Sequence, residues 1–262
     1  MLQDNLKKQA PIFTKIRPKA KFNNLTFLLF SRSYHSGSVL PHALARVEQR
    51  GKKRLTKLER SKFTLDANLE QVLVGNILGD VYMRRFSDRA NTRIVFRQGS
   101  TNAGYLLHLY SLFEKYVNTP PSVTTITDSV TGSIRYNLSF TTLALPCFNS
   151  LYEKFYVNGK KVVPSNIADI LTSVSLAYWI MDDGGFTGSG LKLYTNAFSQ
   201  NELQLLVEAL SKNFSIKASI HKTSIKNQET IYISKNQLPL IINLVRDHMH
   251  PSMLYKLNMT QE

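Results

Sequence analysis

Two apolar segments that each end in aspartate place the strongest limit on how this chain can fold. Residues 73–81 read LVGNILGDV, and residues 176–184 read LAYWIMDDG. The first segment continues a helical spacing of apolar residues that starts at Leu69. Asp80 and Asp183 stand at matching positions, 103 residues apart. We therefore expect one structural unit to occur twice in the chain.

The order of elements around these segments supports a repeat. Apolar and polar residues alternate as they do in strands at residues 92–98, 133–140, 190–196, 215–221 and 229–234. Amphipathic helices lie between strands in both halves, and Ser199 with Glu202 forms a capping box that predicts a helix start. This order predicts an α+β fold with a first repeat over residues 63–170 and a second over residues 171–262.

Residues 1–62 form a basic extension ahead of the repeats. They contain 15 Lys and Arg residues but three acidic ones, so they carry most of the net charge of +15. The stretch RSYHSG at residues 32–37 resembles the end of an organellar transit peptide. A basic leader without a fold of its own is an equal alternative. Residues 51–62, GKKRLTKLERSK, are also candidates for an arm that contacts phosphates.

The composition excludes several classes of protein. A single cysteine, Cys147, rules out an internal disulfide framework and a cysteine-rich zinc site. His248 and His250 lack partners at metal-binding spacing, so we interpret them as surface or structural residues. The longest apolar stretch, residues 25–30, is far shorter than a membrane span. We expect a soluble protein of a reducing compartment with no membrane partner.

The aspartates at the segment ends are unfavourable unless they bind something. A carboxylate at a helix C-terminus faces the negative end of the helix dipole, which costs about 0.3–1 kcal/mol. If the two halves pack through these helices about a pseudo-twofold axis, Asp80 and Asp183 come close together, and a divalent cation relieves their repulsion. Mg²⁺ suits such an open oxygen site. One acidic helix end would be an ordinary C-cap, but two at equivalent positions favour a metal site.

Each half also closes on a lysine. Lys161 follows Asp80 by 81 residues, and Lys256 follows Asp183 by 73 residues. The symmetry that pairs the aspartates would bring one lysine to each side, where a cation stabilises charge developing on a phosphate. Most lysines are solvated surface groups, and Lys160 is an equal candidate by sequence alone.

The polar faces of the predicted strands indicate a nucleic-acid partner. Arg, Lys and Asn at every second residue suit a sheet that lies in the major groove of DNA and reaches base edges and phosphates. The outer face of any antiparallel sheet gives this pattern in one strand, but four such strands favour DNA. The candidate DNA-binding residues are Arg93, Arg97, Arg135, Asn137, Lys192, Tyr194, Asn196, Lys217 and His221.

The segments LVGNILGDV and LAYWIMDDG resemble the paired signature helices of the LAGLIDADG homing endonucleases, especially the single-chain, two-repeat type of mitochondrial introns. GKKVVPSNI and MLYKL are similar in type and place, so the resemblance covers residues 66–258. It implies an αββαββα unit used twice, with saddle-shaped antiparallel sheets straddling DNA and signature helices at the interface. Its implied metal ligands are Asp80 and Asp183, with Gly79 and Asp182 beside them.

This resemblance implies a function. We expect a monomeric, mitochondrial, site-specific endonuclease that cuts both strands of DNA with Mg²⁺, or with Mn²⁺ as a substitute, and so promotes intron mobility. Lys161 and Lys256 would assist catalysis. The alternative is an RNA-binding intron maturase of the same fold, with or without cleavage activity, and a third possibility is a DNA-binding remnant with a dead site. The intact aspartates and lysines favour the endonuclease.

Two positions depart from the family pattern. Val81 replaces the usual closing glycine of the first motif, and Tyr178 stands where a glycine would let the helices approach. The first motif keeps Gly75 and Gly79. We therefore expect large residues of the second helix to face small residues of the first.

Overall fold

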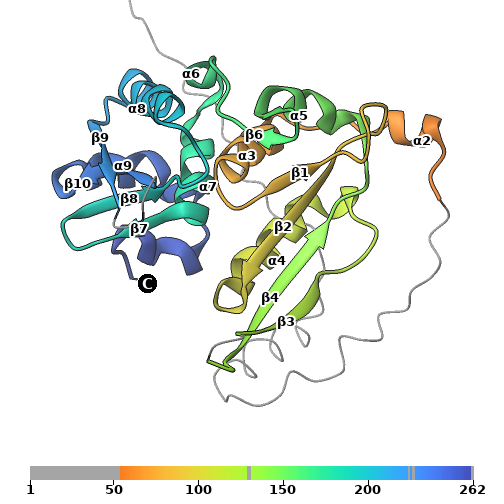
Figure 1. Ribbon diagram of the computed structural model, residues 1–262, viewed down its shortest axis with the longest axis horizontal. Helices are drawn as coiled ribbons and strands as arrows, with labels where there is room; N and C mark the ends of the chain where they lie inside the picture. Colours follow the sequence, from red (N-terminus) through yellow and green to blue (C-terminus); the bar gives the residue numbers. More distant parts are fainter. Residues whose placement is uncertain (1–53, 129–130, 224, 226–227, 261–262) are drawn as a thin grey trace, which may run out of the picture. The chain divides into compact units, whose positions relative to one another are not determined.

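The computed structural model describes residues 54–260 except for 129–130, 224 and 226–227. The chain divides into two units, Met1–Glu48 and Gln49–Glu262, and every described residue belongs to the second unit. Our predictions for residues 1–53, including the transit-like stretch, lie outside the described residues. The described part of the chain consists of two similar halves, each with a four-stranded antiparallel sheet (Figure 1).

The first half begins with the signature helix α3 (Ala67–Leu78) and has the strand order β1-β2-β4-β3. Its strands are β1 (Tyr82–Arg84), β2 (Arg93–Gly99), β3 (Ser122–Thr127) and β4 (Ile134–Thr141). Its other helices are α4 (Ala103–Phe113), α5 (Asn149–Phe155) and α6 (Ile167–Ile170), and its 3₁₀ turns are η2 (Ser100–Asn102), η3 (Glu114–Tyr116) and η4 (Pro146–Phe148). A short pair lies between α5 and α6, formed by β5 (Tyr156–Val157) and β6 (Lys160–Lys161).

The second half repeats this plan from the signature helix α7 (Ser173–Asp183) onward, with the strand order β7-β8-β10-β9. Its strands are β7 (Gly184–Phe186), β8 (Gly190–Tyr194), β9 (Ala218–Lys222) and β10 (Glu229–Ser234). Its other helices are α8 (Gln200–Phe214), α9 (Leu238–Val245) and the 3₁₀ segments η5 (Lys235–Gln237), η6 (Arg246–His248) and η7 (Pro251–Leu257). The equivalent strand orders of the two sheets confirm the predicted α+β fold of two repeats.

The predicted strands all occur, although their boundaries shift. Lys217 precedes β9 and Asn196 follows β8, so these two candidate DNA-binding residues lie outside the strands. The sequence did not predict β1, β3 or β7. Strands β1 and β7 have three residues each, too few for a visible alternation. Every residue of β3 is exposed, so the strand has no buried face that an alternation of apolar and polar residues would mark in the sequence.

Polar side chains fix where the main helices begin. Asp66 accepts a hydrogen bond from the backbone N–H of Asn68 and opens α3. Thr172 caps α7 in the same way. The predicted capping box of Ser199 and Glu202 is confirmed at the start of α8. Short polar signals therefore set the starting points of both signature helices.

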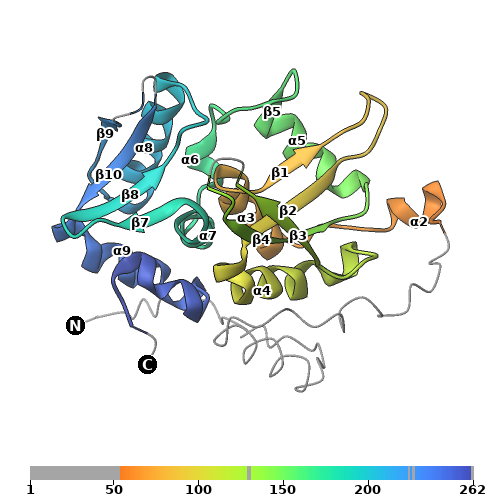
Figure 2. The same ribbon diagram turned by 60° about the horizontal axis from the view of Figure 1, so that its bottom comes forward.

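The signature helices α3 and α7 pack directly against each other between the two sheets (Figure 2). A Cβ atom at Gly75 would lie 2.2 Å from the carbonyl oxygen of Ser175 and 2.9 Å from Cβ of Tyr178. A Cβ atom at Gly79 would lie 2.4 Å from Cβ of Asp182. The expected packing of small residues against large ones is confirmed. It brings the C-terminal ends of the two helices together.

Apolar side chains fill the space between each sheet and its helices. In the first half α4 packs on β2 and β4, where Phe96 and Phe140 stack with ring centroids 4.5 Å apart. In the second half Trp179 of α7 is completely buried. No helix among the described residues is long and apolar enough to cross a membrane.

The described end of the predicted extension contacts the first half. Helix α2 (Lys57–Ser61) opens with a capping box between Thr56 and Glu59. Arg60 donates a hydrogen bond from Nη1 to the carbonyl oxygen of Ala144, at 3.5 Å. Residues 54–62 are therefore attached to the first repeat through α2.

Candidate active site

The two predicted catalytic aspartates meet where the signature helices end. Asp80 follows Gly79, the C-cap of α3, and Asp183 is the last residue of α7. The strands β1 and β7 start within two residues of them, so each aspartate sits at a helix-to-strand junction. The side-chain amide of Gln98 donates from Nε2 both to Asp80 and to Asp182, the residue before Asp183, so the two junctions lie side by side. The structure therefore brings the predicted pair together.

The predicted lysines hold the same two junctions. Lys161 donates from Nζ to the carbonyl oxygens of Gly79 and Val81, both at 2.8 Å. Lys256 donates from Nζ to the carbonyl oxygen of Asp182 at 2.9 Å. Gly79 and Asp182 each directly precede one of the predicted catalytic aspartates, so the two lysines occupy equivalent places in the two halves. Lys161, and not its neighbour Lys160, makes this contact.

Burial shifts the pKa values of these charged groups. It raises the pKa of Asp183 to about 7, and the negative charge of Asp80 adds to the increase, while Lys161 and Lys256 oppose it. The same lack of water lowers the pKa of both lysines, and the carboxylates oppose that shift. The junction therefore contains carboxylates whose repulsion the lysines relieve only in part.

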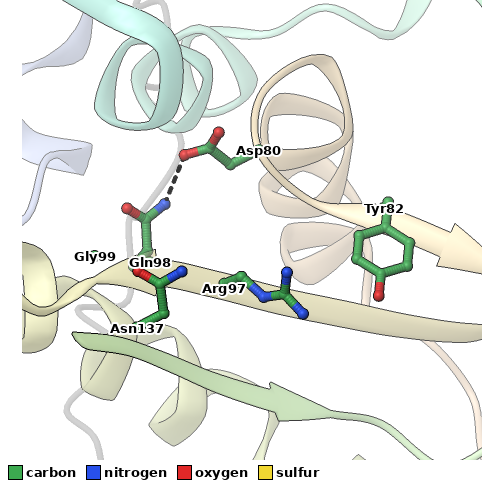
Figure 3. Close-up of a pocket in the computed structure, with 6 residues that line it drawn as sticks. All are labelled: Asp80, Tyr82, Arg97, Gln98, Gly99 and Asn137. Atoms are coloured by element: carbon green, nitrogen blue, oxygen red, sulfur yellow. Dashed lines mark hydrogen bonds between the residues drawn. The ribbon is translucent and has the colours of Figure 1, made fainter. Parts of the chain in front are cut away.

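Asp80 is the more open member of the pair. Its side chain reaches solvent, but the protein atoms around its carboxyl group exclude enough water to raise its pKa. A hydrogen bond from Gln98 opposes this increase. It joins Nε2 of Gln98 to Oδ2 of Asp80 at 3.1 Å (Figure 3). Gln98 therefore supports the ionised form of Asp80.

Gln98 was not among the sequence-predicted site residues. It also donates from Nε2 to Oδ1 of Asp182, at 3.2 Å, and its own Oε1 accepts from Nδ2 of Asn102, at 3.1 Å. A signal was present in β2, because Gln98 continues the buried face of Ile94 and Phe96. A glutamine on an apolar strand face needs buried partners, which marks it as a candidate.

A buried polar network lies behind the aspartate pair. Asp182 is 7% exposed, and its Oδ2 accepts a hydrogen bond from Nδ2 of Asn76 at 2.9 Å. The same Nδ2 donates to the hydroxyl oxygen of Tyr105, also at 2.9 Å. Burial and the charge of Asp80 raise the pKa of Asp182 well above its ordinary value. Both carboxyl oxygens of Asp182 are thus engaged by amides, and its predicted metal role stays a prediction.

A pocket of about 280 Å³ opens beside Asp80. Two of its lining residues, Arg97 and Asn137, are candidate DNA-binding residues from neighbouring strands, and Figure 3 shows them below Asp80. Tyr82 and Gly99, which the sequence did not single out, complete its lining together with Gln98. The pocket thus joins the aspartate junction to the polar face of the first sheet.

The other candidate DNA-binding residues occupy varied environments. Arg135 is exposed on β4 and lies 3.7 Å from Asp128. Arg93 is partly buried, and its guanidinium lies 5.1 Å from the ring centroid of Phe86. Tyr194 is exposed near the end of β8.

The sheet of the second half carries the remaining candidates. Lys192 is half-buried on β8, and the ring of His221 stacks on Tyr232 at 4.7 Å. Lys217 and Asn196 are exposed just outside their strands. Both sheets therefore carry polar faces, but only the first reaches the pocket beside Asp80 among the described residues.

The donor set of the junction suits a hard divalent cation. Among the described residues no three His, Cys, Asp or Glu side chains converge into a closed metal cage. Mg²⁺ does not require one, because it binds through one or two carboxylates and completes its coordination with water and phosphate. Two interacting carboxylates, one of them beside an open pocket, fit that requirement.

His250 and His248 have structural contacts, in agreement with their interpretation. The ring of His250 lies 5.1 Å from that of His108 on α4, and its Nδ1 lies 2.8 Å from Oγ of Ser252. His248 lies 3.5 Å from Oγ of Ser173 at the start of α7. These contacts join the C-terminal segment to the signature helix and to the first half.

Residues 70–241 match the LAGLIDADG DNA endonuclease family. The cytochrome b mRNA maturase bI2 of Debaryomyces hansenii is 36% identical over 197 residues, which cover 74% of this chain and 74% of that protein. The probable intron-encoded endonuclease 1 of Wickerhamomyces canadensis is 32% identical over 202 residues, covering 74% and 85%. The structure of the homing endonuclease I-WcaI bound to its DNA recognition sequence aligns with a TM-score of 0.74 at 31% identity, covering 80% of this chain and 96% of that one.

Proposed function

Because this chain belongs to the LAGLIDADG DNA endonuclease family, we propose that it is a divalent-metal-dependent endonuclease that cuts both strands of a specific DNA site. The observation that carries this proposal is the paired junction of α3 and α7. Asp80 directly follows the C-cap of α3, Asp183 is the last residue of α7, and a lysine holds each junction. A DNA duplex presents two scissile phosphates, so two equivalent acidic positions match the substrate.

Asp80 and Asp183 would hold the metal, preferentially Mg²⁺, with Mn²⁺ as a substitute. A bound divalent cation supplies positive charge to the phosphate and makes the attacking water more acidic. Lys161 and Lys256 keep the two backbone junctions in place and add positive charge beside the phosphates. Gly79 and Asp182 are weaker candidates for metal ligands than Asp80 and Asp183. The carbonyl of Gly79 already accepts a hydrogen bond from Lys161, and amides already donate to the carboxylate of Asp182.

The polar sheet faces would select the DNA site. Arg97 and Asn137 line the pocket beside Asp80, so they would contact the backbone and bases next to the cut. Arg135 and Tyr194 are exposed further along the two sheets and would contact flanking positions. The similarity to a homing endonuclease that was solved with its DNA recognition sequence supports this assignment.

One chain supplies both halves of the proposed site, so we expect it to act as a monomer. Size-exclusion chromatography with light scattering should give the mass of one chain, 29.8 kDa, less any leader that is removed. We also propose a mitochondrial location and a role in intron mobility. The intron-encoded and cytochrome b relatives support both.

An intron maturase that binds RNA is the second candidate. It is favoured by the 36% identity to a cytochrome b mRNA maturase over three quarters of the chain. Binding to structured intron RNA and to duplex DNA should be compared at matched salt, because phosphate contacts make both affinities salt-dependent. Tight RNA binding without cleavage of any DNA would favour the maturase.

Cleavage of a plasmid library tests the proposed endonuclease. The library carries randomised inserts and intronless mitochondrial gene segments, and it is incubated with Mg²⁺, with Ca²⁺ and with EDTA. We expect linear products that share one sequence at their ends, in the Mg²⁺ sample alone. Products that also form in EDTA would contradict the metal requirement.

A further inference from the structure

The two halves of the site differ at one matched position, and we propose that this difference makes them cut the two DNA strands at unequal rates. The inference rests on the proposed endonuclease function. It assigns Gln98 and Asp182 as positioning residues that serve Asp80, and it gives Asp183 no equivalent support.

Strand register identifies the matched position. When Asp80 is aligned with Asp183, Tyr82 of β1 corresponds to Gly185 of β7. Tyr82 pairs with Val95 across the first sheet, and Gly185 pairs with Lys192 across the second. Three residues beyond Val95 on β2 is Gln98, and three residues beyond Lys192 is Thr195. These two residues therefore occupy equivalent places in the two sheets.

The side chain of Gln98 is fixed from three directions. Its Nε2 donates to Asp80 at 3.1 Å and to Asp182 at 3.2 Å, while Asn102 donates to its Oε1 at 3.1 Å. Because Asn102 requires an acceptor on one side and Asp182 requires a donor on the other, the amide has one favourable orientation. That orientation keeps a donor on Asp80.

Thr195 gives no such support to the second aspartate. It is 2% exposed, and its Oγ1 donates to the carbonyl oxygen of Glu229 at 3.1 Å. This hydroxyl is therefore committed to the neighbouring strand. Among the described residues, no side chain donates a hydrogen bond to the carboxylate of Asp183.

The carboxylate of Asp182, which accepts a hydrogen bond from Gln98, has no counterpart in the first signature motif. The position equivalent to Asp182 in the first motif is Gly79, where a Cβ atom would lie 2.4 Å from Cβ of Asp182. Close packing therefore prevents a second copy of the anchor. Asp182 is itself held by Asn76, whose Nδ2 also donates to Tyr105. Gln98 of the first half and Asp182 of the second half therefore both support Asp80, and neither donates a hydrogen bond to Asp183.

Unequal support should produce unequal rates. A hydrogen bond that orients a ligand carboxylate is worth tenfold to a hundredfold in metal affinity or activity at comparable sites, so a difference of about tenfold between strands is expected. Each cut adds one water across a phosphodiester: the bond from phosphorus to the water oxygen forms, the bond to O3′ breaks, and O3′ takes a proton. We expect the strand served by Asp80 to be cut first.

Strand-specific cleavage measures this difference. A supercoiled plasmid that carries the selected site is incubated with Mg²⁺, and the two strands of a matching duplex are labelled with different dyes. Wild-type protein should accumulate nicked circles and cut one strand about tenfold faster. Gln98→Ala and Asp182→Asn should slow the fast strand and bring the ratio close to one. Gln204→Ala, an exposed glutamine of α8, is the matched control and should keep the ratio.

The ratio separates positioning from folding, because both strands are cut by the same folded molecules. A loss of folded protein lowers both rates together and leaves the ratio unchanged. Equal rates in the wild type, or a ratio that neither Gln98→Ala nor Asp182→Asn changes, would overturn the inference while the endonuclease stands. No cleavage of either strand by the wild type would overturn the proposed function and this inference together.

Discussion

In the first half the signature helix α3 contains Gly75 and is capped by Gly79, whereas α7 of the second half carries Tyr178 and Asp182 at the matching places. The small residues of one helix receive the large residues of the other. Two copies of α7 would clash here, and two copies of α3 would leave a gap. The packing surfaces of the two signature helices are therefore complementary rather than identical.

The junction of the first half has more supporting hydrogen bonds than the junction of the second half. Lys161 binds two backbone carbonyls in the first half, and Lys256 binds one in the second. Gln98 donates a hydrogen bond to Asp80, whereas the hydroxyl of Thr195 donates to the carbonyl oxygen of Glu229. The two predicted catalytic aspartates thus have unequal supports, although their places in the repeat are equivalent.

The largest effect on stability is expected from filling the space between the helices. Gly75→Ala should lower the free energy of unfolding by about 3 kcal/mol or more, because the added carbon meets the backbone oxygen of Ser175. Gly104→Ala is the matched control, since its Cβ would lie 3.6 Å from His250, an ordinary contact. The control should change stability by at most about 1 kcal/mol. Urea denaturation measures both, and equal effects would contradict the proposed packing of the halves.

The lysines should differ in their contribution to stability. Lys161→Met removes hydrogen bonds to two carbonyls and should lower the free energy of unfolding by about 2 kcal/mol. Lys256→Met removes one and should lower it by about 1 kcal/mol. Thermal and urea denaturation of both variants test this order. The reverse order would show that the second junction depends more on its lysine.

Acid should weaken the contact between the halves at His108. Burial lowers its pKa from 6.5 to about 4, and the nearby His250 adds to the shift. The unfolded chain therefore takes up this proton first, so stability is full above pH 6.5 and is lost as the pH falls towards 4.

The measurement compares urea midpoints at pH 7 and pH 5. We expect a loss of about 2 kcal/mol from His108 over that interval. His108→Gln should show a smaller loss than the wild type, whereas the exposed variant His221→Gln should match the wild type. An unchanged loss in His108→Gln would contradict this assignment.

The effect on DNA binding concerns matched positions on the two sheets. When the two halves are aligned by strand register, Arg97 of β2 is equivalent to Tyr194 of β8. Arg97→Ala should weaken binding of the target DNA roughly tenfold and reduce the salt slope by about 0.9, because one phosphate contact is lost. Tyr194→Ala should leave the slope unchanged. Fluorescence anisotropy with Ca²⁺ at several salt concentrations would measure this, and equal slopes for both variants would contradict a phosphate contact by Arg97.

The sequence was sufficient for the repeat and for the groups at its centre. Asp80 and Asp183 could be paired because both end an apolar helix, a pattern that depends on local residues alone. Gln98 could not be assigned in the same way. Its meaning depends on Asp182, which lies 84 residues away and meets it only after the two helices pack. The same holds for the contacts of His108, whose Nε2 lies 2.9 Å from the hydroxyl of Tyr178 on the other half.

The position of the edge strand β3 was also beyond the sequence pattern. None of its residues is buried, so its pairing with β4 arises from backbone hydrogen bonds rather than from an apolar face. Asn196 and Lys217 were placed on strands that end or begin one or two residues away. Strand ends depend on turns between neighbouring strands, which alternation does not encode.

The central claim is that Asp80 and Asp183 together form a metal-dependent cleavage site. The most direct test is Mg²⁺-dependent cleavage of the selected target by the wild type, Asp80→Asn and Asp183→Asn, with the exposed Asp88→Asn as the matched control. Binding of the same DNA in Ca²⁺ is measured in parallel. We predict that both site variants lose double-strand cleavage by a factor of a thousand or more, on the order of 4 kcal/mol, while DNA binding and the Asp88→Asn control are retained. Full double-strand cleavage by either site variant would contradict the claim.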